Sequence, residues 1–143
     1  MSQTHYYEVN VQWKEGRIGA LSSPVLTEII ECATPPEFPN GVPGIWSPEH
    51  LFVAAINSCY MATFLAIAEN FKVNLKSFSC NTIAKLEKVD GRYLITEAEL
   101  VPVINLENPE DKDKAIRVAE KAKTGCLVTN SMKTEIILNP QIL

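Results

Sequence analysis

The apolar segment that starts at Ser47 constrains the fold more than any other feature of the chain. Ser47 suits a helix N-cap, Pro48 the first helical position, and Glu49 complements the helix dipole. The segment is then mostly apolar as far as residue 68, and Asn70 suits a C-terminal cap. We therefore predict one helix over residues 48–70, ~34 Å long at ~1.5 Å per residue. Because it is apolar nearly all round, the helix should be central in the fold.

A membrane span is the rival interpretation of this segment. Asn57, Ser58 and Thr63 interrupt the apolar run, so no unbroken stretch reaches the ~18 apolar residues that a span needs. The whole chain is 46% hydrophobic and 21% charged, as in ordinary soluble proteins. The first residues have neither a basic nor an apolar region typical of a secretion signal. We therefore expect no membrane insertion and a cytoplasmic location.

Length, charge and cysteine spacing narrow the functional classes. A chain of 143 residues predicts a single domain over 1–143. The net charge of −4 argues against non-specific binding to nucleic acid. The four cysteines form no CxxC pair and the chain has two histidines, so we predict no metal site and no cofactor.

The remaining segments complete an α+β pattern, in the order βββ-α-ββ-α-β. Residues 4–13 alternate between apolar and polar, which predicts a half-buried strand. Pro102 suggests that its strand lies at an edge or contains a bulge. The other predicted elements are strands over 17–21 and 25–31, a stiff proline-rich loop over 34–47, a hairpin of strands 75–87 and 93–105, a helix from Asn108-Pro109 to Gly125, a turn over 126–131 and a strand over 133–138.

Two of the four cysteines, Cys59 and Cys126, are candidates for a redox-active pair. Cys59 lies in the middle of the predicted central helix, where burial would raise its pKa unless a cation lies nearby. Arg17 is the candidate cation, and Glu49 is the candidate carboxylate for a desolvated arginine. Cys126 is expected at a helix C-terminus, which makes it a poor first nucleophile but leaves it able to condense with a sulfenic acid on Cys59. The residues alone also leave core packing open for Cys59.

The spacing of Glu49 and Cys59 bears on assembly. They are ten residues apart, so ~15 Å along one helix axis and on different faces. If both serve one site, Glu49 must come from a partner chain. A homodimer would also cover a central helix that one small sheet leaves exposed.

Three segments carry a resemblance to a known family. The run Ser47–Cys59 resembles the first signature of the OsmC/Ohr family, and Cys126–Val128 with Asn130 and Ser131 resembles its second. The segment Gly16–Gly19, which contains Arg17, resembles the N-terminal part of the organic hydroperoxide resistance branch. Leu127, where relatives often have proline, and the proline-rich loop leave the subfamily open.

This resemblance implies an OsmC-like α+β fold and an intertwined homodimer with sites at the interface. It implies that Cys59 and Cys126 reduce organic hydroperoxides, that Arg17 and Glu49 support the first thiol, and that an external dithiol of lipoyl type restores the enzyme. The apolar residues that we expect to contact the substrate are Phe52, Ile56, Tyr60 and Met61. Two alternatives remain: a non-catalytic dimer that binds an apolar ligand, and a hydrolase that uses Glu49 or His50 as base.

Overall fold

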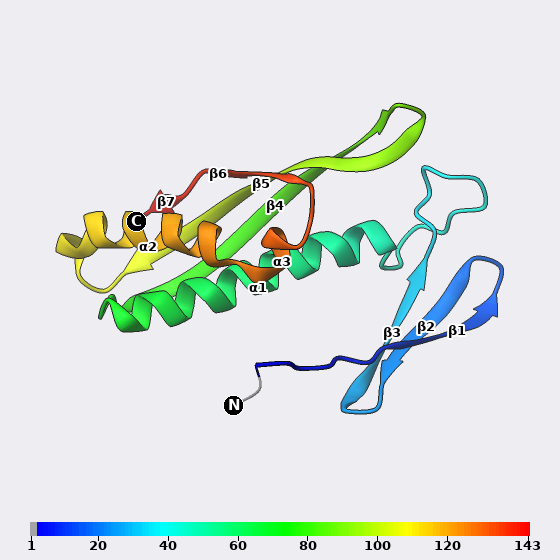
Figure 1. Ribbon diagram of the computed structural model, residues 1–143, viewed down its shortest axis with the longest axis horizontal. Coiled ribbons are helices and arrows are strands. Elements are labelled where there is room, and N and C mark those ends of the chain that lie inside the picture. The colour runs from blue at the N-terminus through cyan, green and yellow to red at the C-terminus, as the bar shows by residue number, and fades with distance from the viewer. Residues whose placement is uncertain (1–2) are drawn as a thin grey trace. The chain divides into compact units, whose positions relative to one another are not determined.

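Two compact units make up the chain, Met1–Phe52 and Val53–Leu143, and the structure is a computed structural model that describes residues 3–143 (Figure 1). Together they contain two sheets and a long helix, which confirms the predicted α+β class. Each unit is described by itself below, and the prediction of one domain over residues 1–143 stays a prediction.

The first unit contains a three-stranded antiparallel meander. Its strands are β1 (Asn10–Glu15), β2 (Ile18–Ser23) and β3 (Leu26–Ala33), in the order β1-β2-β3. Gly16 forms the first turn at φ +52°, a conformation that glycine adopts without steric cost. Arg17 follows in the same turn and is exposed. The predicted meander is therefore confirmed.

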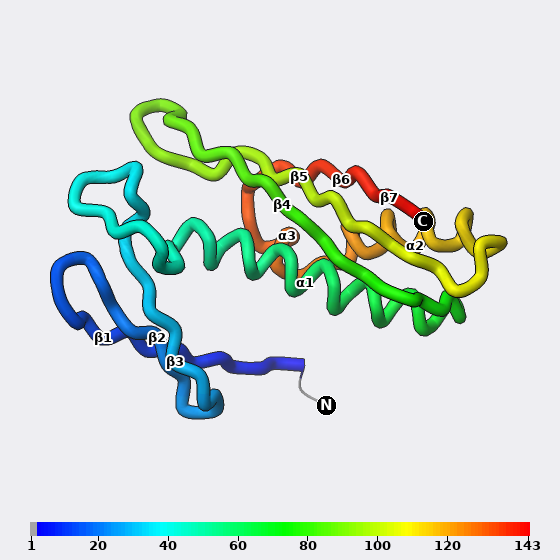
Figure 2. Tube along the Cα trace, turned by 180° about the vertical axis from the view of Figure 1, so that it is seen from behind, coloured from blue at the N-terminus to red at the C-terminus, as the bar shows by residue number. Residues whose placement is uncertain are grey.

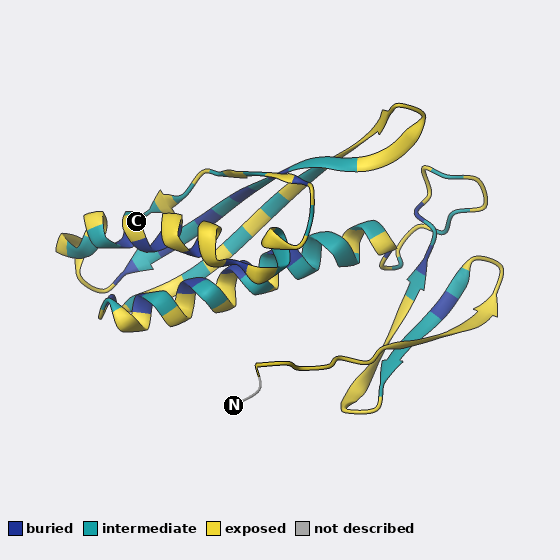
Figure 3. Cartoon of the chain, viewed as in Figure 1, coloured by how far each residue is buried: buried dark blue, intermediate teal, exposed yellow. Residues whose placement is uncertain are grey.

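The prediction for the first strand is wrong in two respects. The strand begins at Asn10 rather than residue 4, and all six of its residues are exposed (Figure 3). Val11 and Trp13, on the face expected to be buried, are 60% and 76% exposed. The alternation identifies an apolar face, but nothing in the described chain covers that face.

The loop before the central helix is ordered by its own backbone. Val42 donates to the carbonyl of Thr34 at 2.9 Å, and a Cβ at Gly41 would collide with the carbonyl of Pro35. The loop leads into helix α1 (Pro48–Asn70). As predicted, Ser47 caps this helix, because its Oγ accepts a hydrogen bond from the His50 amide at 3.0 Å.

In the second unit, α1 packs against the sheet through one stripe of side chains four residues apart. The buried members of the stripe are Ile56, Tyr60, Phe64 and Ala68. The rings of Tyr60 and Phe64 lie 6.4 and 4.9 Å from the ring of Phe78 in β4, centroid to centroid. Most of the helix outside this stripe is exposed or half-buried, although its composition is apolar on every side (Figure 3).

The sheet of the second unit is built on a long hairpin. Strands β4 (Leu75–Val89) and β5 (Arg92–Leu106) pair antiparallel, and Asp90 and Gly91 turn the chain at positive φ, as the predicted Asp-Gly turn requires. On the other side of β5 lie the parallel strands β6 (Glu135–Leu138) and β7 (Gln141–Ile142). The sequence did not predict β7, a strand of only two residues. Figure 2 shows α1 lying along β4 and β5.

The prediction that Pro102 lies in an edge strand or at a bulge is wrong. β5 is a central strand, and the two register shifts of its pairing with β4 lie elsewhere. The carbonyls of Leu100 and Ile104 accept hydrogen bonds from Asn139 and Leu143, so Pro102 directs its own backbone toward the same side. Pro102 lies opposite the gap between β6 and β7, so the N–H that proline lacks is not needed for a hydrogen bond to either strand.

The second helical region follows β5. A short 3-10 turn, Pro109–Asp111, leads into α2 (Lys112–Gly125), which buries Ala115, Val118, Ala119 and Ala122. The predicted turn over residues 126–131 is instead largely a one-turn helix, α3 (Leu127–Asn130). Cys126 is thus both the C-cap of α2 and the N-cap of α3.

Candidate active site

The structure brings the two predicted cysteines together. Cys59 lies in the middle of α1, and Cys126 follows the last residue of α2. The end of α2 lies close to α1, since a Cβ at Gly125 would lie 3.6 Å from Cγ2 of Thr63. The two thiols are near enough to form a side-chain hydrogen bond. Both are free; Cys126 is fully buried and Cys59 is half-buried, so Cys59 is the more accessible sulfur.

The surroundings of Cys59 favour its thiolate. Burial acts to raise its pKa and is the largest single effect. Hydrogen bonds from the backbone of Val128, the Cys126 thiol, the Thr63 hydroxyl and the backbone of Leu127 act in the other direction. Together these bonds outweigh burial, so the pKa of Cys59 lies below its ordinary value. A lowered pKa increases the thiolate fraction, which is the reactive form.

The two backbone donors come from the first turn of α3. The first amides of a helix have no partner within it, so those of Leu127 and Val128 are free to point at another group. Cys126 anchors this turn, because its carbonyl accepts hydrogen bonds from the Asn130 amide at 3.0 Å and from Thr129 Oγ1 at 3.1 Å. The sequence placed Cys126 only at a helix C-terminus and missed both donors. No side chain marks a backbone amide, so the sequence offered no signal for them.

Thr63 also supports Cys59, but more weakly. Its Oγ1 lies 4.0 Å from the Cys59 sulfur and donates to the Cys59 carbonyl at 2.8 Å. The shorter bond uses the only hydroxyl hydrogen, so little remains for the sulfur. Unlike the amides of α3, this residue could have been found from sequence, because positions i and i+4 are neighbours on a helix.

Arg17 and Glu49 both belong to the first unit, Met1–Phe52, whereas the two cysteines belong to the second. Arg17 forms no ion pair within residues 3–143. Oε1 of Glu49 is shielded from solvent and has no hydrogen-bond partner among those residues. α1 is unbroken from Pro48 to Asn70, so Glu49 and Cys59 are ~15 Å apart along the helix axis. The placement of Arg17 and Glu49 beside a Cys59 thiol stays a prediction.

The four apolar residues predicted to contact the substrate differ in exposure. Ile56 and Tyr60 are fully buried, and the Tyr60 hydroxyl donates to the carbonyl of Ala119 at 2.8 Å. Phe52 is half-buried, and Met61 is 42% exposed. The structure thus gives Ile56 and Tyr60 a packing role in the core, and contact of any of the four with a substrate stays a prediction.

The other candidate groups have simpler explanations. Cys80, in β4, has a pKa raised by burial. The contact between Ser47 Oγ and His50 Nδ1, at 2.7 Å, resembles the nucleophile and base of a hydrolase. Ser47 is fully buried and caps α1, so its oxygen is not available to a substrate. Within residues 3–143, no three His, Cys, Asp or Glu side chains lie close enough to hold a metal ion.

Comparison with known proteins identifies the family. A model of the family described as OsmC-like protein matches residues 41–140, and the chain therefore belongs to the OsmC-like proteins. No curated protein matches the chain. By length and composition alone α1 could cross a membrane, but core helices of soluble proteins share this property. In the OsmC-like fold this apolar helix is a core helix.

Solved structures share the fold at low sequence identity. An OsmC-like protein of unknown function from Vibrio cholerae is 23% identical, with a TM-score of 0.87 over 96% of this chain and 99% of the other. An organic hydroperoxide resistance protein from Elizabethkingia anophelis is 19% identical, with a TM-score of 0.76 over 99% and 98%. One from Legionella pneumophila is 17% identical, with a TM-score of 0.74 over 99% and 98%.

Proposed function

We propose that the protein is a cysteine-based peroxidase that reduces organic hydroperoxides. One observation carries the proposal: the pKa of Cys59 lies below its ordinary value, owing to donors that include the first turn of α3, and a second thiol, Cys126, lies beside it. A lowered pKa and an adjacent second thiol are the two properties of a redox-active cysteine pair. Family membership and the names of the Legionella and Elizabethkingia proteins point to the same chemistry.

The reaction proceeds in three steps. The Cys59 thiolate attacks the distal oxygen of the hydroperoxide, the O–O bond breaks, and the alcohol leaves after taking a proton. Cys59 is now a sulfenic acid, and the Cys126 sulfur attacks it to form a disulfide and release water. An external dithiol then reduces the disulfide and restores both thiols. We propose a lipoyl-type dithiol for this step and a cytoplasmic location, where thiols are kept reduced.

Arg17 and Glu49 complete the proposed site, in a homodimer. Arg17 stabilises the thiolate and the charge that develops on the peroxide, and Glu49 pairs with Arg17. The unpartnered Oε1 of Glu49 supports this, because a shielded carboxylate oxygen needs a donor. The exposed apolar residues of β1 and α1, such as Trp13, Met61 and Leu65, support a partner chain that covers them. Phe52, Ile56, Tyr60 and Met61 form the apolar surroundings that favour organic hydroperoxides over hydrogen peroxide.

Turnover tests the proposal. The purified protein should consume tert-butyl hydroperoxide when dithiothreitol is supplied, with loss of two of its four free thiols before the dithiol acts. A protein that binds an apolar ligand without catalysis would keep all four thiols after peroxide treatment. That result would refute the peroxidase proposal and favour the ligand-binding alternative.

A mixed dimer tests the shared site. Cys59→Ser subunits and Glu49→Ala subunits should each be inactive alone, so they are combined and the heterodimer is isolated. If each site draws on both chains, one of its two sites regains Cys59 together with a partner's Glu49, and activity partly returns. No recovery in a verified heterodimer would refute the shared site while leaving the peroxidase chemistry standing.

A further inference from the structure

The charge of the chain is unevenly distributed, and α2 is the exception to its acidic character. Five of the 13 basic residues but only two of the 17 acidic ones lie in α2, so the helix carries +3 and the rest of the chain −7. The basic residues are Lys112, Lys114, Arg117, Lys121 and Lys123. Of these only Lys114 forms an ion pair within residues 3–143, with Asp111 at 4.0 Å. The helix therefore presents unpaired positive charge on a protein that otherwise repels anions.

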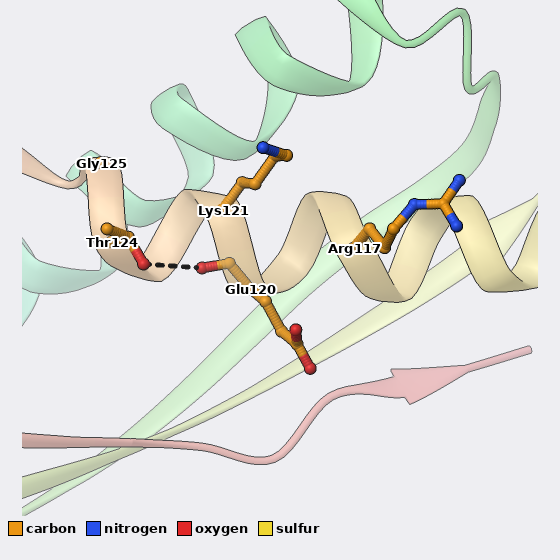
Figure 4. Close-up of a pocket in the computed structure, with 5 residues that line it drawn as sticks. All are labelled: Arg117, Glu120, Lys121, Thr124 and Gly125. Atoms are coloured by element: carbon orange, nitrogen blue, oxygen red, sulfur yellow. Dashed lines mark hydrogen bonds between the residues drawn. The ribbon is translucent and has the colours of Figure 1, made fainter.

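Part of this charge lines a depression that extends to Gly125, the residue before Cys126. The depression has a volume of about 620 Å³ and is lined by Arg117, Glu120, Lys121, Thr124 and Gly125 (Figure 4). Lys121 lies over the ring of Phe71, with Nζ 5.9 Å from the centroid. Figure 4 shows the carboxylate of Glu120 and the ammonium of Lys121 directed to opposite sides of α2, so Glu120 leaves Lys121 unneutralised.

The depression along α2 lies close to the two cysteines. The depression reaches Gly125, which is followed by Cys126 and lies against Thr63, and Thr63 Oγ1 is 4.0 Å from the Cys59 sulfur. In the disulfide, Cys59 contributes the accessible sulfur because Cys126 is fully buried. A reductant must therefore approach Cys59, and one that lies along α2 reaches it at the end of that helix.

We propose that the exposed basic face of α2 is the docking surface for an acidic protein that carries the reducing dithiol. This rests on the proposed function, since it assigns the partner of the disulfide that the peroxidase forms. This basic face is formed by Lys114, Arg117 and Lys121, which follow one another at spacings of three and four residues and so share one side of α2. They extend over ~10 Å at ~1.5 Å per residue, which matches more than one carboxylate on a protein surface rather than a single one on a small molecule. Charge complementarity of this kind raises the rate of encounter.

The reduction balances without any further reactant. One thiolate of the partner attacks the Cys59 sulfur, which forms a mixed disulfide and releases Cys126 as a thiolate that takes up a proton. The second thiol of the partner then loses its proton and attacks its neighbour, which releases Cys59. The partner gives up two electrons and becomes a disulfide, and both cysteines of the peroxidase are thiols again.

The test uses the full chain oxidised to the Cys59–Cys126 disulfide with diamide, so that it does not depend on reaction with peroxide. The reductants are two synthetic peptides with the same Cys-Gly-Pro-Cys centre, one flanked by glutamates and the other by glutamines, and the neutral dithiothreitol. At low ionic strength the glutamate peptide should reduce the disulfide about tenfold faster than the glutamine peptide. High salt should remove that advantage.

Variants locate the effect. Arg117→Glu/Lys121→Glu should abolish the advantage of the glutamate peptide and leave reduction by dithiothreitol unchanged. Lys88→Glu/Arg92→Glu makes the same change of net charge at the tip of the β4–β5 hairpin, which points away from α2 (Figure 1), and should keep the advantage. Arg117→Gln/Lys121→Gln should remove part of the advantage of the glutamate peptide. This variant replaces Arg117→Glu/Lys121→Glu if the latter does not fold.

Two results would overturn the docking surface: equal rates for the two peptides with the wild-type protein at low salt, or an equal loss in the hairpin variant. Consumption of tert-butyl hydroperoxide is measured on the same preparations. A protein that shows the charge selectivity but consumes no hydroperoxide would support the docking surface and refute the peroxidase function alone.

Discussion

Cys59 and Cys80 are two half-buried thiols of the same unit whose pKa values shift in opposite directions. Burial acts to raise the pKa of both. Around Cys80, hydrogen bonds from Thr82 and the backbone of Val101 do not offset it, whereas around Cys59 the donors of α3, Cys126 and Thr63 do. Cys80 is also the more deeply buried of the two, so lighter burial and more hydrogen-bond donors together distinguish the environment of Cys59 from that of Cys80.

The largest effect on activity is expected when Cys59 and Cys80 are each replaced by serine. Cys59→Ser should abolish consumption of tert-butyl hydroperoxide, because a serine hydroxyl is not ionised at neutral pH. Cys80→Ser should keep the activity close to wild type. The measurement is peroxide consumption with dithiothreitol supplied. Activity that survives in Cys59→Ser, or that disappears only in Cys80→Ser, would reverse the roles of the two thiols.

Replacing the neighbouring thiol should separate oxidation from resolution. Cys126→Ser should still oxidise once, because Cys59 keeps the amides of α3, but it cannot form the disulfide. Steady-state turnover should therefore fall while the first oxidation persists. Mass spectrometry after one equivalent of peroxide should find Cys59 as a sulfenic or more highly oxidised acid. An intact Cys59 in this variant would remove the resolving role from Cys126.

The pH dependence of alkylation compares the two environments directly. Only the thiolate reacts, so a thiol with a lowered pKa reaches its maximal rate at lower pH, and one with a raised pKa at higher pH. Cys59 should therefore be alkylated by iodoacetamide at a lower pH than Cys80. The rates are measured residue by residue by mass spectrometry under native conditions. Profiles that coincide, or that are in the opposite order, would show that the donors around Cys59 do not offset its burial.

The smallest expected effect concerns Thr63. Thr63→Val should lower the rate of Cys59 oxidation by about fivefold at most, since a neutral hydrogen bond contributes about 1 kcal/mol and this one is long. Thr63→Ser keeps the hydroxyl and serves as the control. A loss in Thr63→Val as large as that in Cys59→Ser would mean that the amides of Leu127 and Val128 are not the main donors.

The parts of this account that were accessible from sequence are those with local signals. Ser47 and Pro48 mark the start of α1, and the structure confirms them, because capping depends on residues next to each other in the chain. The helix ends at Asn70 as predicted, but Asn70 is not its left-handed cap, because the residue with positive φ at this end is Lys72, at φ +58°. The Asp90-Gly91 turn is confirmed for the same reason. The proximity of Cys59 and Cys126 could be inferred only from resemblance to a family, since 66 intervening residues separate them.

Other features depend on contacts that a sequence does not display. The amides of Leu127 and Val128 are invisible in side-chain patterns, although they help to lower the pKa of Cys59. The exposure of β1 depends on what covers it, which alternation does not reveal. Pro102 is tolerated in a central strand because its neighbours β6 and β7 are separate strands, which follows only from the pairing.

Peptide mapping of the cysteines after one equivalent of tert-butyl hydroperoxide tests the central claim most directly. The reduced protein is treated without added dithiol, the remaining thiols are blocked, and each cysteine is assigned by mass spectrometry. The account predicts a disulfide between Cys59 and Cys126, with Cys32 and Cys80 still free. Four free thiols, or oxidation at Cys80 with Cys59 intact, would contradict it.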